Sequence, residues 1–151
     1  MRRTPRQDKV LGDAIDEVRA VYAELANRPV ERNCTRLTEC CQFKLTGKTP
    51  FLTKGEAVVA AKALRANGRK DMPKAIDGAC PFLVPQTGKC MVYEGRPFGC
   101  RTHFCAAAGG PYDRREVLDL IRRLEVVDYA LRGEGPKPIE GIVLEALEEM
   151  G

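Results

Sequence analysis

Seven cysteines and one histidine are the side chains of this chain best suited to chemistry. An odd number of cysteines cannot all pair within one chain, and thiolates are soft donors that suit zinc, copper(I) and iron–sulfur centres. We therefore predict that these side chains bind a metal, and that oxygen-preferring magnesium and calcium are excluded. The candidate ligands are Cys34, Cys40, Cys41, Cys80, Cys90, Cys100, Cys105 and His103.

The number of donors exceeds the need of one simple centre. A tetrahedral zinc site takes about four nitrogen or sulfur ligands, and a cubane iron–sulfur cluster about four cysteines. The eight candidates allow two separate zinc sites or one bridged cluster. Cys40 and Cys41 are adjacent, so in extended backbone one ligates while the other packs, or each serves a different metal. Cys41 or Cys105 could instead pack as a small hydrophobe, and His103 could be a hydrogen-bonded surface residue.

Several other residues form short motifs together with the later cysteines. The motifs are Cys80-Pro81-Phe82-Leu83, Cys90-Met91-Val92-Tyr93, and Arg96-Pro97 followed by Cys100-Arg101. This order resembles the YkgJ-type cysteine-cluster proteins, a zinc- or iron-chelating domain family with a C-x-x-C-x-x-C-C signature. The resemblance implies metal chelation. It also allows an iron–sulfur redox or catalytic protein, because larger relatives include the flagellin lysine N-methylase.

The first cysteine cluster departs from that signature at one position. In C-T-R-L-T-E-C-C, Leu37 stands where the family has its second cysteine. Cys105 and His103 follow the Cys100-Arg101 motif, and our hypothesis is that one of them takes the vacant coordination position.

Known catalytic patterns give little support to an enzyme. The chain contains no phosphate-binding glycine loop, no dinucleotide fingerprint, no H-E-x-x-H and no zinc-deaminase signature. A nucleophile pair of His103 with Cys100 or Cys105 can be drawn, but metal ligation explains the same residues more simply. We expect Arg96 and Arg101 to balance thiolate charge or to bind loop carbonyls, with an anionic substrate as the alternative. No reaction is assigned.

Composition defines the setting of the metal site. The chain has 151 residues, 44% hydrophobic and 30% charged, which predicts a single globular domain over 1–151. No apolar stretch approaches the ~20 residues that cross a bilayer, and the N-terminus lacks the apolar core of an export signal, so we expect no membrane partner and a reducing, cytoplasmic location. A net charge of +4 is only weak evidence for a nucleic-acid partner, because a dedicated binder usually concentrates positive charge in a stripe, and we expect no such partner. A protein partner of a zinc-stabilised interaction module remains a third hypothesis, with no feature that identifies it.

The elements that must position the cysteines are mainly helices. Apolar residues at helical spacing predict a first helix over about 8–27, with an inner face of Leu11, Ala14, Ile15, Val18, Val21, Tyr22 and Leu25. A capping signature predicts a second helix that starts at Thr53, three residues before Glu56, and stops before Gly68. A third helix begins near Asp113, and a fourth follows Pro138 with Ile139, Val143, Leu144 and Leu147.

The cysteines lie in the irregular connections between these helices. Only Met91–Tyr93 looks capable of forming a short strand. We therefore expect a mainly α fold, in which three or four helices pack around an irregular cysteine-rich metal-binding loop region.

Overall fold

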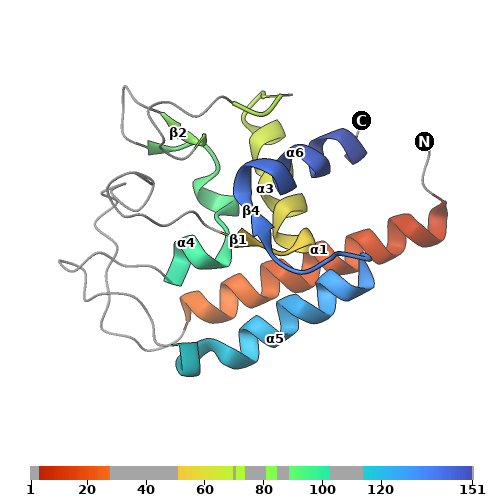
Figure 1. The fold of residues 1–151 in the computed structure, drawn as a ribbon, viewed down its shortest axis with the longest axis vertical. Helices are drawn as coiled ribbons and strands as arrows, with labels where there is room; N and C mark the ends of the chain where they lie inside the picture. Colours follow the sequence, from red (N-terminus) through yellow and green to blue (C-terminus); the bar gives the residue numbers. More distant parts are fainter. Residues whose placement is uncertain are drawn as a thin grey trace.

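The fold is mainly helical, as predicted. The computed structural model describes residues 4–27, 51–69, 71–73, 81–84, 89–102 and 114–150. Four long helices, which we call the helical framework, make up most of this part (Figure 1). They are α1 (Pro5–Ala26), α3 (Lys54–Ala66), α5 (Arg114–Ala130) and α6 (Ile139–Met150). None of the described helices is both long enough and apolar enough to cross a membrane.

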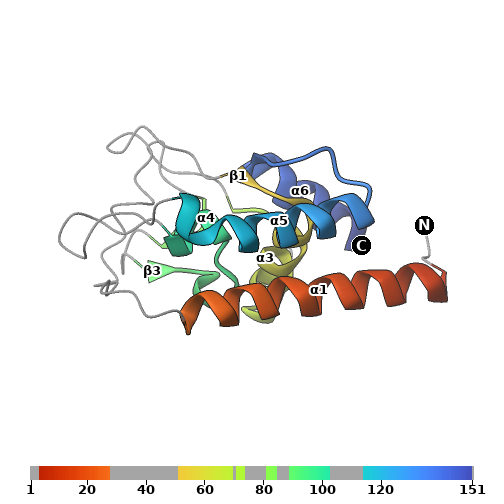
Figure 2. The ribbon, with the colours of Figure 1, turned by 90° about the horizontal axis from the view of Figure 1, so that it is seen from below.

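The remaining described elements are short. Strand β1 (Phe51–Leu52) pairs antiparallel with β4 (Lys137–Pro138), and β2 (Leu83–Val84) pairs antiparallel with β3 (Lys89–Cys90). A 3-10 turn, η2 (Tyr93–Gly95), and a short helix, α4 (Phe98–Thr102), follow β3. Figure 2 shows that β3 and α4 lie toward the C-terminal end of α1, away from its first turns.

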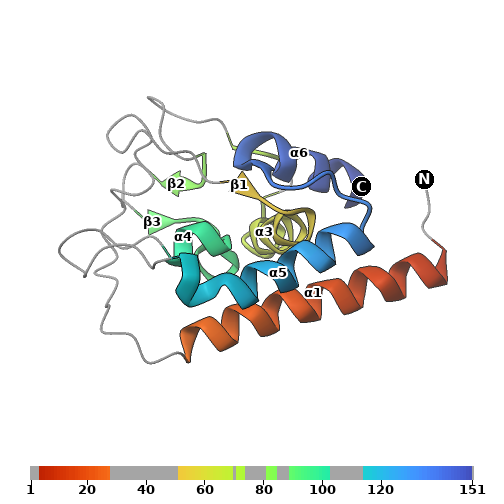
Figure 3. The ribbon, with the colours of Figure 1, turned by 60° about the horizontal axis from the view of Figure 1, so that its bottom comes forward.

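Helix α3 lies at the centre of the helical framework. Seen nearly end-on in Figure 3, it lies between α6 on one side and the antiparallel pair of α1 and α5 on the other. Apart from Lys54 and Glu56, its first half consists of small or β-branched residues, and every residue from 55 to 61 is buried. A side chain on Gly55 would come within 2.6 Å of Val127 and 2.9 Å of Val18. The small residues of α3 therefore let three helices approach it closely.

The hydrophobic core follows the predicted helix faces. The inner face of α1 is buried from Ala14 to Leu25, and α5 buries Val117, Leu120, Leu124 and Val127. In α6 the buried residues are Ile139, Ile142, Val143, Ala146 and Leu147. Leu144, which we grouped with the apolar residues of this helix, is 43% exposed. It lies outside the core because the buried stripe follows positions i, i+3, i+4, i+7 and i+8 from Ile139.

The predicted helix ends agree well with the structure. Thr53 and Glu56 form the predicted capping box of α3, and Gly68 follows the helix at φ +80°. The amide of Arg69 donates to the carbonyl of Leu64, which completes a Schellman-type end. At the other terminus α1 begins earlier than expected, at Pro5, because Thr4 and Gln7 form a second capping box.

The predicted strand at Met91–Tyr93 was wrong. The strand is Lys89–Cys90, one step earlier, and the amide of Met91 extends its pairing with a hydrogen bond to the carbonyl of Phe82 at 2.8 Å. The chain then turns because Gly95 packs directly on α3. A Cβ at Gly95 would lie 2.8 Å from Cβ of Ala63 and 3.1 Å from the carbonyl oxygen of Val59.

Candidate metal centre

Two of the predicted ligands, Cys90 and Cys100, lie in the described part of the chain. Both belong to residues 89–102, which we call the cysteine segment, and both are half-buried. The other six candidates, Cys34, Cys40, Cys41, Cys80, His103 and Cys105, lie outside the described residues. Within the described ranges, no three His, Cys, Asp or Glu side chains are grouped so that they could hold a metal.

Cys90 is positioned by a strand pair and by the C-terminal end of α3. It lies opposite Leu83 in the β2–β3 ladder. Directly after it, the carbonyl of Met91 accepts a hydrogen bond from the side-chain amide of Asn67, the residue that caps the end of α3. The backbone on both sides of Cys90 is therefore fixed by hydrogen bonds.

Cys100 is positioned by α4 and by the N-terminal end of α3. The amides of Cys100 and Arg101 both donate to the carbonyl of Pro97, at 3.1 and 3.2 Å. The amide of Phe98, the residue after Pro97, donates to Oε2 of Glu56 at 2.7 Å. The first turn of α4 is thus attached to the first turn of α3.

Glu56 is a buried carboxylate with four hydrogen-bond donors around it. Its Oε1 accepts from the amide and the hydroxyl of Thr53, at 3.2 and 3.0 Å. Its Oε2 accepts from the amide of Phe98 and, at 3.4 Å, from the hydroxyl of Tyr22. Burial raises the pKa of Glu56, while these four bonds act in the opposite direction. Burial, followed by the nearby charge of Glu56, also raises the pKa of Tyr22, which keeps the phenol protonated.

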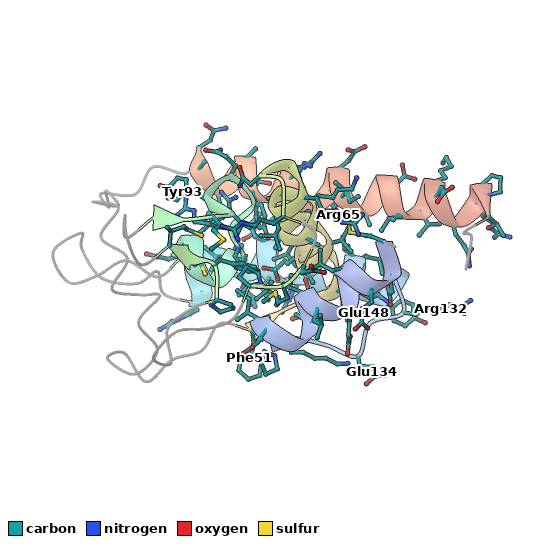
Figure 4. All side chains as sticks on the ribbon, turned by 90° about the horizontal axis from the view of Figure 1, so that it is seen from above. Phe51, Arg65, Tyr93, Arg132, Glu134 and Glu148 are labelled. Carbon is teal, nitrogen blue, oxygen red and sulfur yellow. The ribbon has the colours of Figure 1, made fainter. Side chains whose placement is uncertain are left out.

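The two arginines of the cysteine segment bind backbone carbonyls, as predicted. Arg96 donates from Nε to the carbonyl of Tyr93 at 3.0 Å and lies over the Tyr93 ring at 3.8 Å. Arg101 donates to the carbonyls of Arg96 and Glu94, at 2.8 and 2.7 Å. These contacts fold α4 back against η2. Figure 4 shows Tyr93 at the end of the molecule opposite Arg132.

Arg101 also brings positive charge to the neighbourhood of Cys100. Its guanidinium lies over the ring of Tyr22 at 4.0 Å, so a side chain of α4 packs against a side chain of α1. Burial lowers the pKa of Arg101, and electrostatic interactions with groups that include Tyr22 and Cys100 oppose that effect. An arginine remains a cation under such conditions and favours the thiolate form of a nearby cysteine.

Sequence reasoning identified the cysteines but missed the side chains that hold their backbone. Glu56 was recognised only as a helix cap, Tyr22 only as part of an apolar face, and Asn67 was not singled out. The T-K-G-E pattern could reveal the cap, because its partners are three residues apart. No local pattern reveals that Glu56 also binds Phe98, which is 42 residues away.

The donor chemistry of the described site fits a soft metal. Cys90 and Cys100 are two sulfur-bearing side chains, and the backbone near each of them is bound by a side chain at one end of α3. Zinc and iron–sulfur centres use such ligands.

Comparison with known proteins gives one family. A model named CxxCxxCC and described as "Putative zinc- or iron-chelating domain" matches residues 33–119, a range that includes all eight predicted ligands. This agrees with the resemblance seen in the cysteine motifs. Searches of the curated proteins and of the solved structures found no significant match.

Proposed function

The chain belongs to the CxxCxxCC family of zinc- or iron-chelating domains, and on this premise we propose that it binds zinc or iron through clustered cysteine thiolates. Cys90 and Cys100 are two of the ligands. The remaining ligands come from the other predicted donors: Cys34, Cys40, Cys41, Cys80, Cys105 and His103. We treat residues 1–151 as one metal-binding domain, in which the helical framework carries the site.

The observation that supports this proposal best is the way in which the two described cysteines are held. Each lies one or two residues from a backbone group that is bound by a side chain at one end of α3, Met91 for Cys90 and Phe98 for Cys100. Hydrogen bonds outside the ligand shell orient metal ligands and strengthen metal binding. Ordinary surface thiols need no such support.

The chemistry of the site follows from its charges. Several thiolates around one divalent ion carry excess negative charge, which the half-buried guanidinium of Arg101 offsets near Cys100. When bound, zinc would supply a closed tetrahedral crosslink and iron a redox-active centre. The proposal requires reduced thiols and therefore a reducing compartment such as the cytoplasm.

Metal analysis of protein purified without oxygen tests the proposal. We expect stoichiometric zinc or iron by elemental analysis. A colourless zinc protein supports simple chelation, whereas brown protein with acid-labile sulfide identifies an iron–sulfur cluster and favours the redox alternative. Fresh, reduced protein that holds no zinc or iron and takes up neither would overturn the proposal. Aerobic material is unsuitable because exposed thiols oxidise.

Single substitutions then test the ligand set. Cys90→Ser and Cys100→Ser should both lower the metal content, because a hydroxyl is a much poorer ligand for these metals than a thiolate. Met91→Leu is the matched control, since it removes a neighbouring sulfur that is not a predicted ligand and conserves volume. If Cys105 occupies the position left by Leu37, Cys105→Ser should lower metal content about as much as Cys100→Ser. Full occupancy in Cys105→Ser would remove Cys105 from the set.

A further inference from the structure

Two carboxylates are buried at the N-terminal end of α3, although this helix needs only one of them as a cap. Glu56 is 3% exposed and Asp128, near the end of α5, is 6% exposed. Both accept hydrogen bonds from backbone amides. Asp128 binds the amides of Lys54 and Gly135, at 2.7 and 3.0 Å. Burying a carboxylate is costly, so each must provide something that a neutral side chain would not.

The two oxygens of Glu56 do different things. Oε1 closes the capping box with Thr53, which is a local contact within the first turn of α3. Oε2 makes a contact outside the helix, because it accepts a hydrogen bond from the amide of Phe98, the first residue of α4. A helix cap alone would need only Oε1. The second oxygen connects α3 with the short helix that carries Cys100.

Other contacts around α4 also lead from the neighbourhood of Cys100 back to Glu56. Arg101 closes α4 against η2 through two carbonyls and stacks on Tyr22. The hydroxyl of Tyr22 in turn lies 3.4 Å from Oε2 of Glu56. The residues that flank Cys100 are therefore connected with the same buried carboxylate, Phe98 through its backbone amide and Arg101 through Tyr22.

We propose that Glu56 is a positioning residue for the metal centre, which acts through Phe98 to orient Cys100. This inference rests on the proposed function. It assigns to Glu56 a role in metal affinity that goes beyond capping α3. Asp128 has the matching burial and the same helix end, but its bonds go to Lys54 and Gly135 and none of them reaches the cysteine segment.

The substitution Glu56→Gln separates the two roles. Glutamine keeps one oxygen and serves equally well in a capping box, so the bond with Thr53 survives. Its amide group then faces the amide of Phe98, and two donors oppose each other where a hydrogen bond stood. Asp128→Asn is the matched control, because it replaces one oxygen of a buried carboxylate in the same way.

Cobalt(II) is the probe, titrated into reduced, metal-free protein and then displaced by zinc. We expect Glu56→Gln to weaken the affinity for both ions by about tenfold, the lower end of the effect of losing an outer-shell partner. It should also weaken the thiolate-to-cobalt absorption. Asp128→Asn should match the wild type in both readouts, even where the two variants lose similar stability in urea.

The outcomes distinguish this inference from the proposed function. If Glu56→Gln and Asp128→Asn bind cobalt(II) and zinc equally well, Glu56 is only a cap and the inference is wrong. If the wild type binds no metal, the proposed function fails and this inference falls with it. If Glu56→Gln does not fold, Glu56→Asp replaces it, because the shorter carboxylate keeps its charge but retreats from Phe98. The same tenfold criterion then applies.

Discussion

The helical framework and the cysteine segment are held together by different physics. The framework buries continuous apolar faces, and α3 is enclosed so fully that Leu64 within it and Leu52 and Val18 next to it have no exposed surface. The cysteine segment has few buried anchors, among them Val92 and Phe98, and relies on directional bonds from polar side chains. Those side chains are Asn67, Glu56, Arg96 and Arg101.

The helical framework and the cysteine segment therefore differ in how well they tolerate small structural shifts. Apolar burial is non-directional and is shared among many contacts, so small shifts in the framework cost little. A hydrogen bond weakens steeply when its angle or length is wrong. The segment that carries the proposed ligands is therefore the part of the described structure in which geometry, more than buried area, determines function.

The largest effect on stability should come from the framework. Leu64→Ala removes a side chain with no exposed surface from the centre of the core and should lower the free energy of unfolding by about 3 kcal/mol. Leu144→Ala is the control, because Leu144 is 43% exposed, and should stay within about 0.5 kcal/mol of the wild type. Urea unfolding followed by circular dichroism measures both. Similar losses in the two variants would contradict the described core.

A smaller effect should come from the contact between the two regions. Gly95→Ala places a methyl group 2.8 Å from Ala63 and 3.1 Å from the backbone of Val59, so η2 must move away from α3. We expect a loss of about 1–3 kcal/mol. Amide hydrogen exchange should rise across residues 89–102 and stay unchanged in α5. Gly12→Ala is the control, since nothing lies within 4 Å of its new methyl group and alanine favours a helix. Unchanged exchange in the cysteine segment of Gly95→Ala would refute the close packing.

The smallest effect concerns the pH dependence of stability in metal-free protein. Burial raises the pKa of Glu56 above its ordinary value of 4.5, so over the window just above that value the folded chain holds a proton that the unfolded chain has released. The contribution of Glu56 to stability is fully present below this window and is lost as the pH rises through the pKa of Glu56 in the folded state.

Unfolding of the wild type and of Glu56→Gln from pH 4 to 7 isolates this contribution. The stability of the wild type relative to the variant should fall as pH rises, with a slope below about 1.4 kcal/mol per pH unit, the limit for one proton. A relative stability that increases with pH would mean that the four donated hydrogen bonds outweigh burial. The folded state would then favour the carboxylate.

Sequence reasoning succeeded where the determining interactions are local. The helix periods and the cap at Thr53 with Glu56 involve residues three or four apart, and the structure has them as predicted. The capping box of Thr4 with Gln7 is equally local and was overlooked. The strands were harder, because each has only two residues and depends on a partner elsewhere in the chain. Val92 was expected in a strand with Met91 and Tyr93, but it is buried and directly precedes η2.

The sequence by itself determined the helices, their caps and the soft donors that place the chain in a metal-chelating family, because periodicity, caps and ligand chemistry can be read from neighbouring residues. Only the tertiary structure decided that Glu56 reaches Phe98, that Asp128 reaches Lys54 and that Arg101 stacks on Tyr22. These partners are far apart in the sequence. They meet because the apolar faces of α1, α3 and α5 pack together and bring buried polar groups within hydrogen-bonding distance, where each needs a partner.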